Sequence, residues 1–207
     1  MEPVSLSFKH LLYECNDPIQ YVYFLNNCVV SLIRVMEDGG VVEVATIGNE
    51  GMAGLPILLG ATHSPNQAFV QVSGDALRMT VNVFKREVTP GSPLHNLLLR
   101  YTQALMNMLA QSVACNRLHS IEERCCRWLL LSRDRVNSNE FPLTQEFLAQ
   151  MLGVRRASVS EVAAILQKAG LIRYHRGKMM ILNREGLEVG SCECYQIIKK
   201  EFDHLLP

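Results

Sequence analysis

Apolar and polar positions alternate in short runs over the first part of the chain, from about residue 5 to residue 83. The runs are rich in Val, Ile, Phe, Tyr and Thr, which favour strands, and they cover residues 21–24, 29–35, 41–47, 67–72 and 76–83. Asn, Asp, Gly, Ser and Pro, which are typical of tight turns, stand between them. This spacing predicts an antiparallel sandwich or barrel of hairpins, which we assign to residues 1–91.

A long helix is predicted after Pro90-Gly91-Ser92-Pro93, over residues 92–119, because proline is accepted in the first turn of a helix. Its apolar residues recur at alternating steps of four and three, which is the spacing of a coiled-coil seam. We predict a dimer interface along this seam, formed by Leu94, Leu98, Tyr101, Leu105, Met108 and Ser112. Further apolar residues beside the seam indicate a second partner surface on the β-domain; the alternative is a single buried core helix.

The remaining residues, 120–207, carry helix and hairpin patterns in close succession. Ser120 and Glu123 form a capping box that opens a helix to about residue 136. A short helix follows Thr144, and after Gly153 a second helix covers residues 155–168. The positions of the second helix that we expect to face inward are Val159, Val162, Ile165 and Leu166.

A hairpin follows directly on the second helix, with strands at residues 171–174 and 179–182 and a basic tip at 175–178. Two helices joined by a tight turn at a glycine are the sequence form of a helix-turn-helix. A hairpin behind them makes the wing of a winged helix, and its tip can reach the phosphate backbone of DNA.

Basic residues are unevenly distributed, although the net charge of the chain is zero. Residues 143–184 hold seven Lys or Arg against two Asp or Glu, a local charge of +5, so the rest of the chain sums to −5. A basic module on an otherwise acidic chain is typical of nucleic-acid binding. The sequence contains no nucleophile–base set, phosphate-binding loop or dinucleotide fingerprint, so we do not expect an enzyme.

Seven cysteines are scattered along the chain. An odd number of free thiols is ordinary in a reducing cytosol, which predicts a cytoplasmic location. Neither Cys125-Cys126 nor Cys192-Glu193-Cys194 has a second ligand pair at zinc spacing, so we expect packing roles and neither a metal nor a cofactor; a metal or redox role is the alternative. No run of about 18 apolar residues is present, so no membrane partner is expected.

One segment carries a resemblance to a known family. Residues 143–160 (LTQEFLAQMLGVRRASVS) and 166–172 (LQKAGLI) resemble the DNA-binding domain of the Crp/Fnr regulators, and the resemblance extends upstream through residues 118–130 (LHSIEERCCRWLL). In the β-domain, Leu12-Tyr13-Glu14 and residues 21–24 are similar to the first strands of that family. The resemblance implies an α+β protein with an N-terminal antiparallel β jelly-roll, a long central dimerisation helix and a C-terminal winged helix-turn-helix.

The same resemblance implies partners. A homodimer would read a two-fold symmetric operator in double-stranded DNA, one recognition helix per half-site, together with RNA polymerase as a protein partner. Arg156 falls on the family position whose arginine makes a bidentate contact with guanine. Ala157 stands where a base-contacting glutamate is common and Glu161 where a second arginine is common, so the operator should differ from that of the cAMP receptor protein. The full predicted set of DNA-binding residues is Thr144, Gln145, Arg155, Arg156, Ala157, Ser158, Ser160, Glu161, Arg176 and Lys178.

A solvated helix start is the alternative reading of Arg155 and Arg156, although positive charges at a helix N-terminus oppose the helix dipole. For Arg176 and Lys178 the alternative is a hairpin tip that is only solvated.

Family members that bind cyclic nucleotides use a Gly-Glu-Leu segment and, downstream, Arg followed by Ser or Thr and Ala. Here the corresponding residues are Gly54, Leu55, Asn66 and Gln67. Leu55 cannot accept a hydrogen bond from a ribose hydroxyl, and Asn66 has no charge to pair with a phosphate. We therefore predict a degenerate ligand pocket, no use of cAMP and an unknown effector. The alternative function is a small-molecule or redox sensory module with effector-dependent DNA binding.

Overall fold

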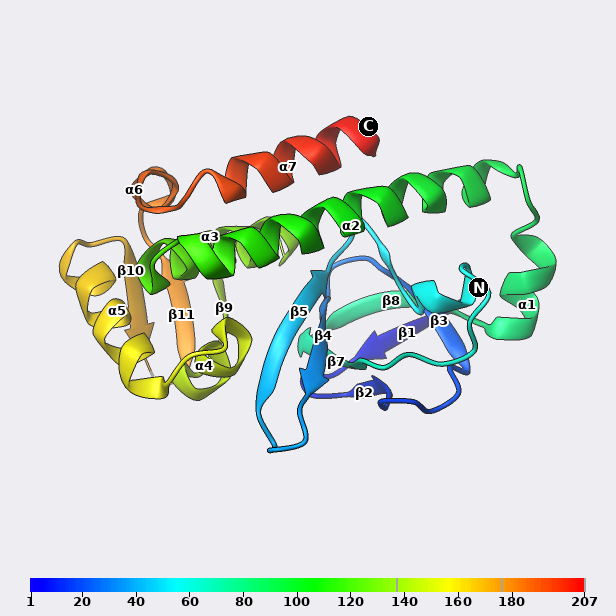
Figure 1. Ribbon diagram of the computed structural model, residues 1–207, viewed down its shortest axis with the longest axis horizontal. Coiled ribbons are helices and arrows are strands. Elements are labelled where there is room, and N and C mark those ends of the chain that lie inside the picture. Colours follow the sequence, from blue (N-terminus) through cyan, green and yellow to red (C-terminus); the bar gives the residue numbers. More distant parts are fainter. Residues whose placement is uncertain (137, 176, 207) are drawn as a thin grey trace.

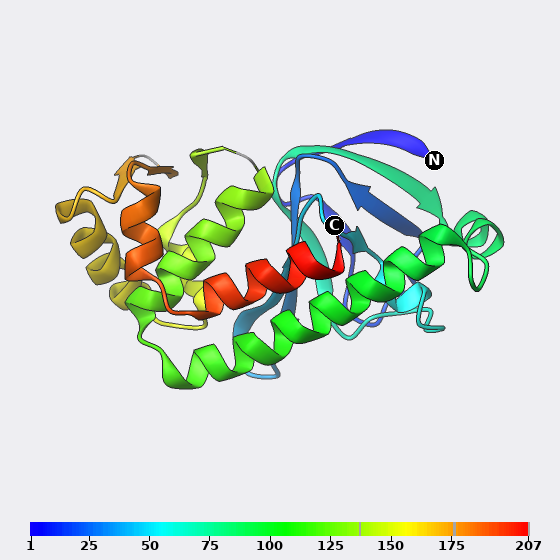
Figure 2. The same ribbon diagram turned by 90° about the horizontal axis from the view of Figure 1, so that it is seen from above.

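The computed structural model describes residues 1–136, 138–175 and 177–206. A β-sandwich lies under one half of a long helix, α2 (Pro93–Leu118), and a smaller unit of helices and a hairpin lies at the other end of that helix (Figure 1). The last helix, α7 (Cys194–Leu205), runs back alongside α2, as the view from above also shows (Figure 2). Within the described residues, no helix has the length and apolar character needed to cross a membrane.

The β-sandwich consists of two four-stranded antiparallel sheets. One has the order β1 (Glu2–Leu6), β8 (Gly74–Thr80), β3 (Tyr21–Leu25), β6 (Met52–Ala53), and the other has the order β2 (Leu11–Tyr13), β7 (Gln67–Val72), β4 (Val29–Val35), β5 (Val41–Ile47). The two sheets enclose one apolar core. The strands predicted at 21–24, 29–35, 41–47 and 67–72 are thereby confirmed, as is the α+β fold class.

The strand predicted over residues 76–83 ends earlier than expected. Strand β8 stops at Thr80, and helix α1 (Val81–Glu87) follows it. The Thr80 hydroxyl accepts a hydrogen bond from the backbone N–H of Val83 at 3.4 Å, which caps the helix start. Phe84 of this helix is buried against the sandwich core, so packing outweighs the strand preference of the β-branched residues before it.

Helix α2 begins after Ser92, whose hydroxyl accepts a hydrogen bond from a backbone N–H of the first turn. One face of the helix packs on the β-sandwich through Leu98, Tyr101, Leu105 and Met108, which are at most 6% exposed. This face therefore belongs to the core of the chain itself.

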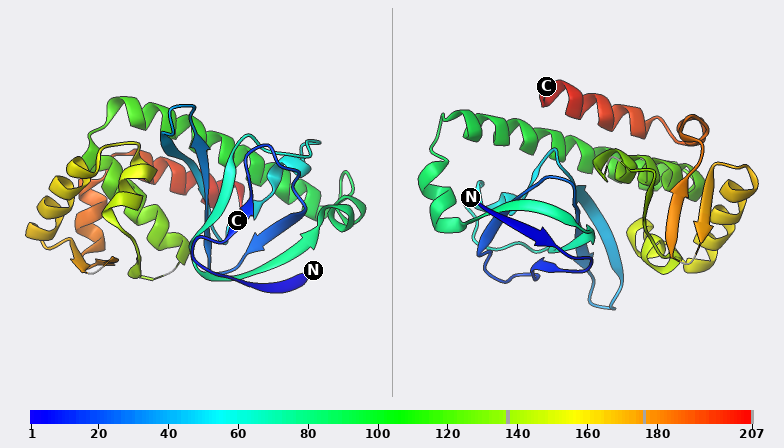
Figure 3. Two further views of the ribbon diagram at one scale, coloured as in Figure 1. Left: turned by 90° about the horizontal axis from the view of Figure 1, so that it is seen from below. Right: turned by 180° about the vertical axis from the view of Figure 1, so that it is seen from behind.

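Two other faces of α2 are distinct from this one. The second face meets α7, where the Asn107 side-chain amide donates a hydrogen bond to Glu201 at 2.7 Å. The third face stays exposed and carries Leu99, Met106 and Val113, which are 45%, 60% and 73% exposed. The views from below and from behind show the sandwich on one side of α2, and the view from behind shows α7 on the other (Figure 3).

The smaller unit opens with α3 (Ile121–Val136), and the predicted capping box is present. The Ser120 hydroxyl accepts from the Glu123 N–H at 3.3 Å, and the Glu123 carboxylate accepts from the Ser120 N–H at 2.8 Å. Strand β9 (Glu140–Pro142), α4 (Gln145–Leu152), α5 (Arg156–Lys168), β10 (Ile172–His175) and β11 (Lys178–Ile181) follow in that order. The three strands form a sheet of order β10-β11-β9, and α6 (Arg184–Gly190) leads on to α7.

The inward face of α5 differs in one residue from the prediction. Val159, Val162 and Leu166 are buried as expected, whereas Ile165 is 50% exposed, and Ala163 is buried instead. A helix turns by about 100° per residue, which carries position 165 away from the stripe formed by the other three. The inward placement of Ile165 was therefore wrong.

Side chains of α3 join the smaller unit to the sandwich. The Trp128 indole N–H donates a hydrogen bond to Glu43 of β5 at 2.8 Å. The Arg135 guanidinium donates to Glu50 and to Thr46, both at 2.7 Å, and is itself almost completely buried. The two units are thus held together by charged and polar groups as well as by α2.

Candidate nucleic-acid interface

A tight turn at Gly153 joins α4 to α5. Its φ of +63° lies in the left-handed region that favours glycine. The Gly153 N–H donates to the carbonyls of Ala149 and Gln150 and so ends α4. A Cβ at this position would lie 3.1 Å from Val42 of β5, so the turn also rests against the sandwich. These constraints fix the direction in which α5 leaves α4.

Three of the predicted DNA-binding residues hold the two helices in place. The Thr144 hydroxyl accepts the backbone N–H of Phe147 at 3.1 Å and caps α4. The Gln145 side chain accepts a hydrogen bond from the Ser160 hydroxyl of α5 at 2.8 Å. The cap at Thr144 confirms the predicted start of α4, whereas Gln145 and Ser160 have a structural role that the sequence analysis did not assign to them.

The N-terminal end of α5 presents two arginines to solvent. Arg155 precedes the helix, Arg156 opens it, and both are exposed, with the Arg156 side chain at 68%. A carboxylate oxygen of Glu146 lies 3.9 Å from the Arg156 Nε, a contact that stabilises little at such exposure. Because cations at a helix N-terminus oppose the helix dipole, these arginines do not stabilise the helix. They suit an anionic partner that would lie against this end of the helix.

The next turn of α5 continues the same exposed surface. Ala157 and Glu161 are exposed, and Ser158 is half-buried. All three lie off the stripe that packs into the core of the unit. The surface that α5 offers to a partner therefore includes the predicted positions 155–158 and 161.

The β10–β11 hairpin is tied closely to both helices. The Tyr174 backbone N–H donates to the Gln167 side chain of α5 at 3.0 Å, and the Tyr174 hydroxyl donates to the Leu143 carbonyl before α4. The Leu143 N–H donates in turn to the Gly177 carbonyl in the hairpin turn at 2.8 Å. The hairpin thus stands beside the start of α4, in the position of a wing.

The hairpin carries two of the predicted phosphate contacts. Lys178 is exposed, and its ammonium lies 3.1 Å from a Glu140 carboxylate oxygen. An exposed pair of this kind is weak enough to be exchanged for a phosphate contact. Arg176 lies outside the described residues.

The seam predicted on α2 is largely occupied within the chain. Leu98, Tyr101, Leu105 and Met108 pack on the sandwich, and Leu94 and Ser112 are half-buried. This corrects the assignment of Leu98, Tyr101, Leu105 and Met108 to a dimer interface, because side chains in the core have no surface left for a second copy. A second series with the same steps of four and three lies on the exposed face; its members are Leu99, Gln103, Met106, Ala110, Val113 and Arg117. The sequence contained this signal, but periodicity alone could not tell the two series apart.

The predicted ligand pocket is built from residues that serve the sandwich. Leu55 is 8% exposed and belongs to the sandwich core, in a 3-10 turn at Leu55–Ile57 that Gly54 opens with a φ of +97°. Asn66 is half-buried, and the Gln67 amide donates to Glu14 at 2.7 Å. Leu55 therefore serves the core of the sandwich, and Gln67 is engaged with Glu14.

The fold is that of a protein class in which a β-sandwich domain and a long helix precede a winged helix-turn-helix. Residues 123–189 match the Crp-like helix-turn-helix domain. The global nitrogen regulator of Synechococcus elongatus is 23% identical to the chain over 178 residues, which cover 81% of this chain and 79% of that protein. Residues 123–189 are thus similar to a Crp-like helix-turn-helix domain, and the chain as a whole is similar to the global nitrogen regulator.

Solved structures of other proteins share the fold. TTHB099, a transcriptional regulator of the CRP family from Thermus thermophilus, matches with a TM-score of 0.75 at 19% identity, over 92% of this chain and 96% of that one. FixK2 from Bradyrhizobium japonicum matches with a TM-score of 0.73 at 15% identity and the same coverage. These two structures show the fold of this chain.

Proposed function

We propose that the chain acts as a homodimer that binds a two-fold symmetric site in double-stranded DNA and regulates transcription without cAMP. The observation that carries the proposal is the exposed pair Arg155 and Arg156 at the first turn of α5, placed there by the Gly153 turn. From that position, side chains reach the base edges of the major groove, and the wing lies where it can contact the backbone.

In vitro selection of DNA sites on the purified full-length chain, without added nucleotide, tests the proposal. We expect enrichment of a site with two inverted halves about one helical turn apart. The affinity should fall steeply with salt, because several basic residues displace counterions. A selection that enriches no symmetric site would contradict the proposal.

A pair of variants tests the role of the recognition helix. Arg156→Ala should cost about 1 to 3 kcal/mol in affinity for the selected site, or about 5- to 150-fold, and should relax the preference at one base pair of each half-site. Arg86→Ala, which removes an exposed arginine of α1 far from the interface, is the matched control. Equal losses for the two variants would show that Arg156 acts through net charge alone.

The proposed dimer uses the exposed face of α2 rather than the face in the core. We expect Met106→Glu with Val113→Glu to give a monomer in sedimentation velocity, with unchanged circular dichroism, because both side chains are exposed in the single chain. Leu59→Glu replaces an equally exposed leucine of the sandwich and should leave the dimer intact. A double variant that remains dimeric would exclude this face.

The remaining parts of the proposal follow from a DNA-bound regulator. RNA polymerase is the expected protein partner, the cytoplasm is the expected compartment, and the effector has no assigned chemistry. We also propose three functional parts of the chain: residues 1–91 form a sensor-like domain, residues 92–119 a dimerisation helix and residues 120–207 a DNA-binding domain. The absence of a ribose acceptor at Leu55 and of a phosphate partner at Asn66 supports a signal other than cAMP.

A further inference from the structure

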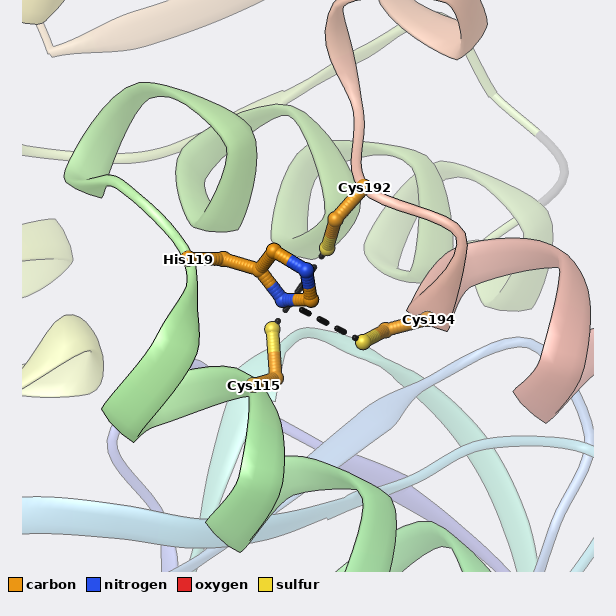
Figure 4. A group of neighbouring side chains, drawn as sticks. All are labelled: Cys115, His119, Cys192 and Cys194. Atoms are coloured by element: carbon orange, nitrogen blue, oxygen red, sulfur yellow. Dashed lines mark hydrogen bonds between the residues drawn. The ribbon is translucent and has the colours of Figure 1, made fainter.

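Four side chains that are common metal ligands meet where α2 ends. Cys115 lies in the last turns of α2, His119 follows that helix, and Cys192 and Cys194 lie where the chain enters α7 (Figure 4). Their ligand atoms, three sulfurs and one ring nitrogen, all lie within 4.8 Å of one another. The three thiols are buried and the imidazole is half-buried, so this thiol–imidazole cluster is largely closed to solvent.

The neighbours of the cluster orient its members. The His119 Nε2 lies 3.2 Å from a Glu193 carboxylate oxygen, while its Nδ1 lies 3.5 Å from the Cys194 sulfur. A carboxylate on the outer ring nitrogen is the usual partner of a metal-binding histidine, because it fixes the tautomer and turns the other nitrogen toward the metal. The Gln111 amide donates to the Cys194 sulfur at 3.0 Å.

Two buried arginines stand beside the thiols. Arg124 and Arg127 are 8% and 7% exposed, and in both the Nε has no hydrogen-bond partner among the described residues. Burial raises the pKa of the Cys115 thiol, and the positive charge of Arg127 acts against that rise. Buried cations need negative charge nearby. Three thiolates and a neutral histidine around a divalent cation carry a net charge of −1. This negative charge would stabilise the two buried guanidinium groups.

We propose that Cys115, His119, Cys192 and Cys194 bind one zinc ion. Three cysteines and one histidine are an established ligand set for structural zinc, with Zn–S distances of about 2.3 Å, which place tetrahedral sulfurs about 3.8 Å apart. The Cys115 and Cys192 sulfurs lie 3.5 Å apart. The cluster thus needs only small side-chain movements to close on the ion.

Other uses of the cluster fit the structure less well. A disulfide requires sulfurs about 2.05 Å apart, and the pair at 3.5 Å consists of two free cysteines. Redox-reactive cysteines are at least partly exposed, whereas Cys115, Cys192 and Cys194 are all buried. An iron–sulfur cluster places several iron and sulfide atoms between its ligands and so needs a wider set. A single thiophilic ion, which deprotonates the thiols that it binds, suits the spacing.

The site would lie at the junction between the long helix and the DNA-binding unit. His119 has an extended backbone, with φ −108° and ψ 152°, and only this residue and Ser120 separate α2 from α3. Zinc would join this junction to α7 and so fix the direction in which α3 leaves α2. The direction of α3 would in turn set the position of the helix-turn-helix on DNA. That effect on DNA binding rests on the proposed function, whereas zinc binding itself does not.

Metal analysis of the full-length chain, purified under reducing conditions, is the first test. We expect about one zinc per chain by mass spectrometry of the metal. Cobalt(II) should replace it and give the intense visible absorption of a tetrahedral site, with thiolate-to-cobalt charge transfer in the near ultraviolet. Absence of both signals, bound iron with sulfide, or a Cys115–Cys192 disulfide found by mass spectrometry would each overturn the proposal.

Substitutions locate the site. Cys194→Ser and His119→Gln should abolish the tetrahedral cobalt spectrum, whereas Cys126→Ser, which alters an equally buried cysteine outside the cluster, should retain it. Circular dichroism shows which variants are folded. Glu193→Gln changes an exposed side chain and should weaken metal binding about 10- to 100-fold without abolishing it. A cobalt spectrum in folded Cys194→Ser equal to that of the parent would refute the assignment.

The outcomes of this test and of the DNA selection are independent. A chain that binds zinc as predicted but enriches no DNA site would keep the metal site and lose the proposed function. A chain that enriches a DNA site but binds no metal would keep the proposed function and lose the metal site.

Discussion

Glu43 links the sandwich to the smaller, helix-turn-helix unit, and its charge should govern the stability of the chain near neutral pH. Its carboxylate accepts hydrogen bonds from the Trp128 indole at 2.8 Å and from the Ser31 hydroxyl at 2.9 Å. Burial raises the pKa of Glu43 from 4.5 to about 7, against the lowering effect of these two hydrogen bonds. The folded chain therefore keeps a proton on Glu43 over a pH range in which the unfolded chain has lost it.

The sign and size of the effect follow from this difference. Between pH 4.5 and about 7 the folded state binds more protons than the unfolded state, so the free energy of unfolding falls as the pH rises through this window. At about 1.4 kcal/mol per pH unit, the full difference corresponds to about 3 kcal/mol. Because part of the Glu43 side chain touches solvent, we expect a loss of about 1 to 3 kcal/mol by pH 8.

Glu43→Gln isolates this contribution, because the amide oxygen can still accept from Trp128 but carries no charge. The variant should lack the loss between pH 5 and 8 that we assign to Glu43 and should be more stable than the parent above about pH 7. Urea unfolding at pH 5 and at pH 8 gives the free energy of unfolding at each pH. The unfolding is followed by the fluorescence of Trp128, the one tryptophan in the sequence. Glu37→Gln, at an exposed position of the same hairpin, is the control. Parallel pH curves for parent and Glu43→Gln would refute the reasoning.

Four further substitutions, measured by urea unfolding, test the packing of the helix-turn-helix unit and its contact with the sandwich. Thr144→Ala removes the cap of α4 and should lower the free energy of unfolding by about 1 kcal/mol. An unchanged free energy of unfolding would contradict the role of this cap. Glu50→Ala leaves the buried Arg135 guanidinium without its carboxylate and should cost about 3 kcal/mol, so a surface-like loss below about 0.5 kcal/mol would argue against this link between the units. Leu166→Ala should lower the free energy of unfolding by about 2 to 5 kcal/mol, whereas Ile165→Gln should change it by no more than about 0.5 kcal/mol. Equal losses for the two variants would show that Ile165 is part of the core after all.

The helix-turn-helix and the wing were predictable from the sequence because their signals are local. The capping box at Ser120, the cap at Thr144 and the glycine turn at Gly153 each act within a few residues of the chain. Strand periodicity is equally local, which is why four strands of the sandwich appear at the predicted positions. Where a local preference met a competing cap, as at Thr80, the prediction ran past the true end of the strand.

Helix α2 shows what periodicity cannot decide. Its sequence holds two series of positions with the same spacing, both with several apolar residues, and only the position of the sandwich shows that Leu98 and Leu105 belong to the core while Met106 and Val113 stay exposed. The hydrophobic effect favours the burial of a side chain but does not specify which surface covers it. The partner of each face of α2 therefore depends on elements that are distant in sequence.

The sequence by itself thus determined the strands, the second helix of the helix-turn-helix with its arginines, and the hairpin behind it, since each rests on contacts between near neighbours. Tertiary structure alone decided that α7 returns along α2 and that Cys115 and His119 meet Cys192 and Cys194. Cys115 and Cys192 are 77 residues apart in sequence, and no local rule for ligand spacing spans such a distance. The core that brings them together forms only when the whole chain has buried its apolar surface.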